Sequence, residues 1–160
     1  MNIRLAQIQD LEEIAQVEAI CFPAAEAASK ESFQKRLKVF PNHFWLLEDE
    51  NQIVSIINGM VSKEEKLQDI MFDDATMHDE AGEWQMIFGV ETIPEYQGRG
   101  CMEYLMKHVI EEVKAQHRKG LVLTCKDRLV HYYEKFGFVN EGISESTHGG
   151  AIWYDMRLTF

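Results

Sequence analysis

The segment from Trp84 to Met106 constrains the fold more than any other part of the chain. An apolar run from Met86 to Val90 is typical of a buried strand, and Pro94 ends it. The sequence Gln97-Gly98-Arg99-Gly100-Cys101 follows, and apolar residues then recur every three to four positions. That spacing predicts a helix with one buried face. The segment therefore predicts a strand, a glycine loop and a helix, in that order.

The glycine loop has the form of a phosphate-binding site. The first amides of a helix have no partner within the helix, and the helix dipole adds positive character where they point. The loop is not a P-loop, because Arg99-Gly100-Cys101 lacks the lysine and the Ser or Thr that follow the glycine there. It is not a dinucleotide fingerprint, because position 103 is Glu. The glycines alone also fit a tight turn before an ordinary helix.

A second motif follows further along the chain. The sequence Tyr132-Tyr133-Glu134-Lys135-Phe136-Gly137-Phe138 comes after an apolar run at 121–125 that is typical of a buried strand. Together with VETIPEYQGRG, from Val90 to Gly100, it resembles the GNAT acetyltransferase superfamily. That superfamily has an acetyl-CoA loop of the form Arg/Gln-x-x-Gly-x-Gly/Ala and carries Tyr-Glu-x-x-Gly-Phe in a later helix. The resemblance covers nearly the whole chain.

The resemblance implies an α/β (α+β) chain with the GNAT acyl-CoA N-acyltransferase fold. Residues 1–160 are expected to form one domain, a mixed central sheet of about seven strands flanked by about four helices. It also implies acetyl-CoA as co-substrate. The residues that would hold its pyrophosphate are Gln97, Gly98, Arg99, Gly100, Cys101 and Met102, and Phe88 and Val90 would bond its pantetheine arm through backbone groups. The family has glycine or alanine where Met102 stands, so this side chain must point away from the cofactor.

The rest of the chain supplies the other elements. Strands are expected at 2–6, 43–47, 52–61, 121–125, 139–145 and 151–158, and helices at 11–21, 29–39 and around 132–133. Asp10 and Ser29 are the expected N-caps of the first two helices. The acidic segment 62–82 is expected to be partly helical and to lie over the active site.

Acetyl transfer to an amine needs a proton donor for the departing thiolate. By resemblance, Tyr133 matches the tyrosine that has this role in many GNAT enzymes. A tyrosine that only packs in the helix is the alternative, and it fits Tyr132 better. Cys101 and Cys125 are expected to be packing residues, because no histidine lies at a spacing that indicates an acetyl-cysteine intermediate.

The closer resemblance is to the arylalkylamine (serotonin) N-acetyltransferase family. It is carried by Cys21-Phe22-Pro23, by Ala75-Thr76-Met77-His78 and by the stretch from Leu129 to Phe138. The vertebrate enzymes of that family relay a proton through two histidines on the central strand. Trp84 and Met86 stand at those positions here, so the base must come from elsewhere.

Glu26 is the first candidate for that base. Insect relatives have a glutamate in the equivalent loop, where it acts as a base, often through water. Glu26 lies among alanines, and a carboxylate that loses its water becomes a stronger base. A solvated loop glutamate is the alternative. Glu83 and Glu91, which precede and follow the apolar part of the central strand, are second candidates, and the loop histidine His78, expected to be exposed, is a weaker one.

Composition excludes several classes of protein. The net charge of −11 argues against a nucleic-acid partner, whereas an acidic surface attracts ammonium groups; solubility alone also explains the charge. Three cysteines without a Cys-x-x-Cys pair and six histidines without ligand spacing predict neither a disulfide framework nor a metal site. With no membrane span or signal-peptide pattern, a cytoplasmic protein is expected.

These features predict an N-acetyltransferase that moves acetyl from acetyl-CoA to a primary amine by direct attack in a ternary complex. A small arylalkylamine or a polyamine-like molecule is the leading acceptor, and a homodimer is compatible with the fold. The first alternative is an acetyltransferase that acts on a protein N-terminus or lysine, which needs an open groove. The second is a CoA-binding sensor module without catalysis.

Overall fold

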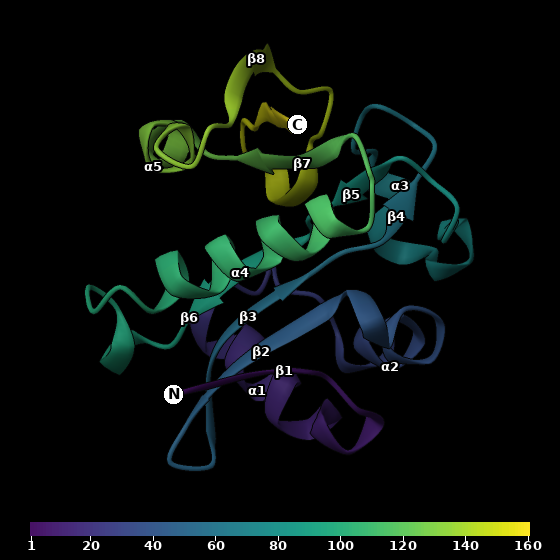
Figure 1. The fold of residues 1–160 in the computed structure, drawn as a ribbon. Coiled ribbons are helices and arrows are strands. Elements are labelled where there is room, and N and C mark those ends of the chain that lie inside the picture. The colour runs from purple at the N-terminus through teal and green to yellow at the C-terminus, as the bar shows by residue number, and fades with distance from the viewer.

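The computed structural model describes residues 1–160 and contains nine strands and five α-helices (Figure 1). The strands are β1 (Asn2–Leu5), β2 (Phe44–Asp49), β3 (Gln52–Asn58), β4 (Val61–Ser62), β5 (Trp84–Met86), β6 (Gly89–Thr92), β7 (Gly120–Cys125), β8 (Val139–Ile143) and β9 (Tyr154–Thr159). The helices are α1 (Leu11–Cys21), α2 (Lys30–Val39), α3 (Asp69–Asp73), α4 (Cys101–Ala115) and α5 (Val130–Glu134). The expected α/β class is confirmed, and the pairing is mixed because β5 and β7 run parallel while β3 and β6 run antiparallel.

The strands form two sheets that meet at the central strand. One sheet has the order β1-β2-β3-β6, and the other has the order β4-β5-β7-β9-β8. The change of sheet takes place at two adjacent residues. The Ile87 N–H donates to the Val122 oxygen at 2.8 Å, whereas the Phe88 N–H donates to the Asn58 oxygen at 2.7 Å. Beyond this point β6 follows β3 and no longer pairs with β7, so the two sheets diverge.

The strand expected at 52–61 is divided at the same place. It consists of β3 and β4, with Gly59 and Met60 between them. A Cβ on Gly59 would lie 1.8 Å from the carbonyl oxygen of Met86, so only glycine allows the two backbones to approach this closely. Because both central strands divide here, the number of strands is nine instead of the expected seven or so.

Helices cover both faces of the β1-β2-β3-β6 sheet. Figure 1 shows α4 crossing one face, with α1 and α2 on the other side. From Ile53 to Asn58 every residue of β3 is buried, as a strand covered on both faces requires. The buried face of α4 has the predicted three-to-four spacing, with Leu105, Val109 and Val113 fully buried. None of the helices is both long and apolar enough to cross a membrane.

The two expected helix caps have different outcomes. Ser29 is confirmed as the N-cap of α2, since its hydroxyl accepts the Ser32 N–H at 3.1 Å. Asp10 does stand at the N-cap position of α1, as expected, but its side chain makes no capping hydrogen bond to the helix. Instead its carboxylate pairs with the guanidinium of Arg4 at 2.7 Å and accepts the Gln7 N–H at 2.7 Å. A short turn at Ile8–Asp10 therefore precedes the helix.

The acidic segment 62–82 is anchored to the body of the protein. It contains α3, as the partly helical prediction required, and a 3-10 turn at Ala75–Met77. Its apolar side chains, Leu67 and Met71 among them, pack with Trp84 in a second, smaller hydrophobic core. This core holds α3 beside the point where the strands divide.

We expect Gly59→Ala to lower the free energy of unfolding by about 2 kcal/mol or more, because the added Cβ overlaps the Met86 carbonyl and one strand must move. Urea denaturation measures this loss. Gly89→Ala is the matched control, since its Cβ would meet the side-chain nitrogen of Asn58 at 3.1 Å, and a side chain can shift. Equal losses in the two variants would contradict a backbone constraint at Gly59.

Candidate active site

A cavity of about 400 Å³ opens where the two sheets diverge. Residues 87–90 form one wall, and residues 123–126 at the end of β7 form the opposite wall. The loop between α1 and α2, the end of α3 and the loop between β8 and β9 complete the lining. Thus segments far apart in the sequence meet at one point, as the carboxyl ends of diverging strands allow.

The backbone of Val90 faces the gap between the sheets. Along β6, the Ile93 N–H donates to the Val54 oxygen of the neighbouring chain segment at 3.0 Å. Hydrogen-bonded and non-hydrogen-bonded pairs alternate along an antiparallel ladder, so Glu91 pairs with β3 whereas the N–H and C=O of Val90 point away from it. Since β6 has no second neighbour, these groups are free for a ligand. Phe88 differs, because its N–H is already bonded to Asn58 and its side chain lines the cavity.

The glycine loop presents a row of free amides. Gly98 and Gly100 have φ of 75° and 79°, which is the left-handed region that glycine favours, and nothing lies within 4 Å of a Cβ built on either. The N–H groups of residues 98–103 donate no hydrogen bond within the protein. They precede or open α4, where the helix dipole favours negative charge. The loop is therefore built to hold an anion such as a pyrophosphate.

The side chains of the other loop residues leave the free amides of the glycine loop accessible. Met102 and Cys101 are buried in the main core, so their side chains leave the loop amides uncovered. The Gln97 side chain donates to the Thr92 carbonyl at 3.0 Å, which ties the loop to β6. The guanidinium of Arg99 lies 4.8 Å from the centre of the Tyr96 ring. The family departure at Met102 thus leaves the backbone of the loop accessible.

Tyr133 is part of the cavity wall and is 6% exposed. Burial strongly raises the pKa of its phenol, so the hydroxyl keeps its proton at neutral pH and can donate it. Cys125, which also lines the cavity, has its pKa raised to about 11 by burial and by Asp127. It therefore remains a thiol, which argues against its acting as a nucleophile.

The glutamates proposed as bases lie in very different places. Glu26 lines the cavity, and its carboxylate pairs with the ammonium group of Lys126 at 2.8 Å. Glu83 does not line it; its carboxylate pairs with Lys119 at 2.7 Å on the surface, where both side chains are more than half exposed. The structure therefore brings Glu26 to the site and leaves Glu83 outside it.

Buried polar side chains form the floor of the cavity beneath β6. Arg36 and Asn58 line it and bond each other at 3.1 Å, but Arg36 Nε and Asn58 Nδ2 have no partner. Glu91 lies below the lining with both carboxylate oxygens unpaired. Burial, and then the negative charge of Glu18, raise the pKa of Glu91. Its environment therefore favours the protonated form of Glu91, in which the carboxyl group is a poor base.

Sequence reasoning missed His148, a half-buried residue of the β8–β9 loop. Its ring lies in the cavity wall and stacks on Phe72, with ring centres 5.5 Å apart and planes 14° apart. The sequence holds no signal for it apart from the following Gly149-Gly150 pair. Among the aromatic residues, Phe22 lines the cavity, whereas Trp45 is fully buried in the core.

The chain matches one protein-family model, and its fold is similar to several solved structures. The model of the acetyltransferase (GNAT) family matches residues 8–138. Among solved structures, the loading GNATL domain of CurA from Lyngbya majuscula is similar at a TM-score of 0.85 with 15% identity, covering 99% of this chain and 96% of that one. The GphF GNAT-like decarboxylase in complex with isobutyryl-CoA has a TM-score of 0.86, 19% identity and 99% coverage of both chains. No curated protein sequence matches the chain.

A third similar structure is a chain of the NatC complex bound to Gag peptide and CoA. It has a TM-score of 0.77 and 12% identity, and the match covers 99% of this chain and 98% of that one. At these identities the structural similarity shows the shared fold.

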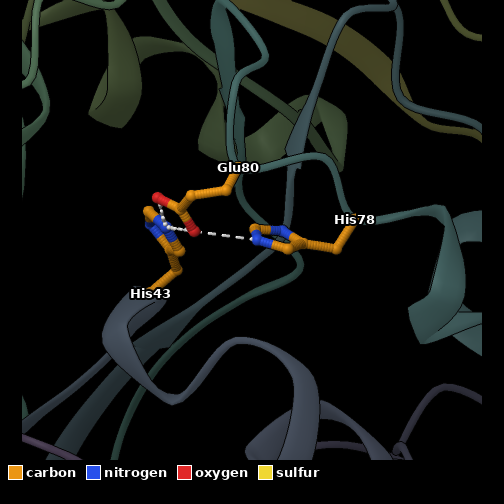
Figure 2. A group of neighbouring side chains, drawn as sticks. All are labelled: His43, His78 and Glu80. Carbon is orange, nitrogen blue, oxygen red and sulfur yellow. Dashed lines mark hydrogen bonds and ion pairs between the residues drawn. The ribbon is translucent and has the colours of Figure 1, made fainter.

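A second polar cluster lies outside the cavity and joins His43, His78 and Glu80 (Figure 2). Both histidines place Nε2 2.9 Å from Glu80, and the guanidinium of Arg118 lies 2.8 Å from the same carboxylate. His78 was expected to be exposed, but its side chain is only 7% exposed. The Val61 N–H donates to Nδ1 of His78 at 3.0 Å. In a neutral ring Nε2 must then carry the proton, so it has no lone pair for a metal, and the cluster is a structural tie.

We expect His43→Gln to flatten the dependence of stability on pH below about pH 6.5, where histidine in an unfolded chain takes a proton. Burial lowers the pKa of His43 in the folded protein, so the unfolded chain binds more protons and stability falls as pH falls, by up to about 1.4 kcal/mol per pH unit. Glu80, whose pKa is lowered to about 2 by hydrogen bonds from His43 and His78 although burial opposes this, extends the loss to lower pH.

Urea denaturation from about pH 7 to about pH 5 gives the free energy of unfolding at each pH, and hence its slope against pH for the wild type and for His43→Gln. His131→Gln is the matched control, because the His131 side chain is 97% exposed. Equal slopes for the wild type and His43→Gln would contradict the proposal that His43 causes the loss of stability at acidic pH.

Proposed function

The chain belongs to the acetyltransferase (GNAT) family, and from that premise we propose that it moves acetyl from acetyl-CoA to a primary amine in a ternary complex. The observation that carries the proposal is the cavity between the diverging sheets. It connects free backbone groups of Val90 with a buried proton donor, Tyr133, and β6 leads directly to the glycine loop.

The residues present fit acetyl-CoA, which supplies the thioester that an amine attacks. Free amides at 98–103 suit its pyrophosphate, and the free N–H and C=O of Val90 suit the amides of its pantetheine arm. Two structurally similar proteins are described with CoA or an acyl-CoA bound, which supports this choice. Tyr133 is then placed to give its proton to the thiolate that leaves.

A small aromatic or cationic amine is the acceptor that the cavity fits best. Phe22, Phe72 and Trp153 offer apolar faces, and Asp73 adds negative charge at the same opening. The net charge of −11 favours the approach of an ammonium group. Because α3 contributes Phe72 and Asp73, part of the acidic segment 62–82 borders the site, which favours a small acceptor over an extended peptide.

A second candidate is the decarboxylation of a carboxyacyl-CoA. Arg36 is 4% exposed, lines the cavity and has an unpaired Nε, so it offers a partner to a carboxylate on the acyl group. The name of one structurally similar protein, the GphF GNAT-like decarboxylase, motivates the same comparison. Release of carbon dioxide from malonyl-CoA, without an amine, distinguishes this activity from acetyl transfer.

Release of free thiol from acetyl-CoA tests the main proposal, with a panel of arylalkylamines, polyamines and peptides as acceptors. Release that depends on a small amine supports it. Release with peptides alone supports the protein acetyltransferase alternative. Tight binding of acetyl-CoA without release by any acceptor favours the non-catalytic CoA-binding module.

We expect Tyr133→Phe to lower kcat by about 100-fold while the Kd for acetyl-CoA stays within about twofold, because the variant keeps the ring and loses only the proton donor. Calorimetric titration measures the binding. Tyr132→Phe is the matched control on the same helix, since Tyr132 is absent from the cavity wall. An unchanged kcat in Tyr133→Phe would exclude this residue as the acid.

A further inference from the structure

We propose that His148 is the general base that takes the proton from the acceptor amine. This inference rests on the proposed acetyl transfer and assigns the residue that completes it. The imidazole of His148 lies in the cavity wall and is supplied by the loop between β8 and β9.

The hydrogen bond of the ring fixes which nitrogen is basic. Nε2 of His148 lies 2.9 Å from the backbone carbonyl oxygen of Glu26. A carbonyl oxygen only accepts hydrogen bonds, so Nε2 carries the proton, and in the neutral ring Nδ1 keeps its lone pair. Nδ1 has no hydrogen-bond partner in the protein, and it is not among the buried unpaired atoms. It is therefore open to a ligand.

Contacts on several sides hold the ring in place. Phe72 stacks on one face, and the indole N–H of Trp153 donates to the His148 carbonyl at 2.8 Å. The His148 N–H donates to the Ser146 hydroxyl at 3.3 Å, and that hydroxyl in turn bonds Asp69 at the start of α3. The loop is thus tied both to the α1–α2 loop and to α3, and a positioned ring suits proton transfer.

The carboxylates near the site are poorer bases. Glu26 already pairs with Lys126 at 2.8 Å, so taking a proton would break an ion pair. Glu91 is absent from the cavity lining, and burial raises its pKa, which favours the protonated form. The charged side chains that line the same cavity are Glu18, Glu26, Asp73, Arg36, Lys126 and Arg128, and Asp69 bonds the Ser146 hydroxyl beside the ring. His148 differs from these groups because its ring is oriented by a hydrogen bond at Nε2, which leaves the lone pair of Nδ1 without a partner in the protein.

During acetyl transfer, His148 accepts the protons of the acceptor amine and Tyr133 supplies the proton of the departing thiolate. An acceptor that arrives as an ammonium ion first loses one proton to Nδ1, which passes it to solvent. As the amine nitrogen attacks the thioester carbon, the N–C bond forms and a second N–H proton moves to Nδ1. The C–S bond breaks with its electron pair on sulfur, and the thiolate takes the proton of Tyr133. Exchange with solvent returns His148 to its neutral form and Tyr133 to its phenol.

The test compares His148→Gln with Glu26→Gln and with the exposed control His131→Gln, using the amine that the wild type turns over fastest. A glutamine amide can still donate to the Glu26 carbonyl, which preserves the loop, but it has no basic nitrogen. We expect His148→Gln to lower kcat by about 100-fold and to remove the fall of kcat/KM at acidic pH, with the Kd for acetyl-CoA within about twofold.

Glu26→Gln keeps the backbone carbonyl that orients the His148 ring. We therefore expect its kcat to fall by less than about tenfold, and its kcat/KM to fall at acidic pH as in the wild type. His148→Ala with added imidazole provides a further readout, because partial recovery of kcat indicates a missing base and a purely structural role would not produce it.

Wild-type kcat and an unchanged acidic fall in His148→Gln would overturn the inference, as would a larger loss in Glu26→Gln than in His148→Gln. In both cases the wild type still transfers acetyl, so the proposed function stands. Failure of the wild type to acetylate any amine contradicts the proposed function itself, and this inference with it.

Discussion

The structure depends on two adjacent amides that donate in opposite directions. Ile87 bonds to β7 and Phe88 bonds to β3, so the central strand belongs to one sheet before this point and to the other sheet after it. A strand that changes partners leaves one edge of β6 unpaired inside the protein, where free N–H and C=O groups are costly unless a ligand bonds them. The close approach at Gly59 makes the division sterically possible, because any side chain there would meet the Met86 carbonyl.

The glycine loop and the cavity have different physical characters. The loop, which lies outside the cavity lining, presents free backbone amides and a helix N-terminus that favour the phosphates of CoA. The cavity wall opposite β6 includes side chains from three separate segments, which the bonds of Glu26, Ser146 and His148 hold together.

Much of the cofactor side could be predicted from the sequence, because it depends on local patterns. The strand, glycine loop and helix between Trp84 and Met106 are present, and Met102 does turn into the core. The cap at Ser29 was also predictable, since its partner lies three residues away. Asp10 stands at the predicted N-cap position, but its carboxylate pairs with Arg4 and not with the helix amides, which the local pattern did not reveal.

The acceptor side depends on long-range contacts, which no local pattern encodes. Glu83 and Glu26 look alike in the sequence, but one pairs with Lys119 on the surface and the other with Lys126 in the cavity. His148 becomes a candidate base only through the Glu26 carbonyl, which is 122 residues away in the chain. The division of two strands into four likewise requires Gly59 and Met86 to be neighbours in space.

The most direct test of the account is whether the unpaired edge of β6 and the glycine loop together bind CoA. Amide NMR spectra recorded while CoA is added report each backbone N–H separately. We expect the largest shifts at Val90 and at residues 98–102, whereas the signals of amides in β1, at the far edge of the sheet, stay unchanged. Binding of CoA with shifts elsewhere and none at Val90 would contradict it.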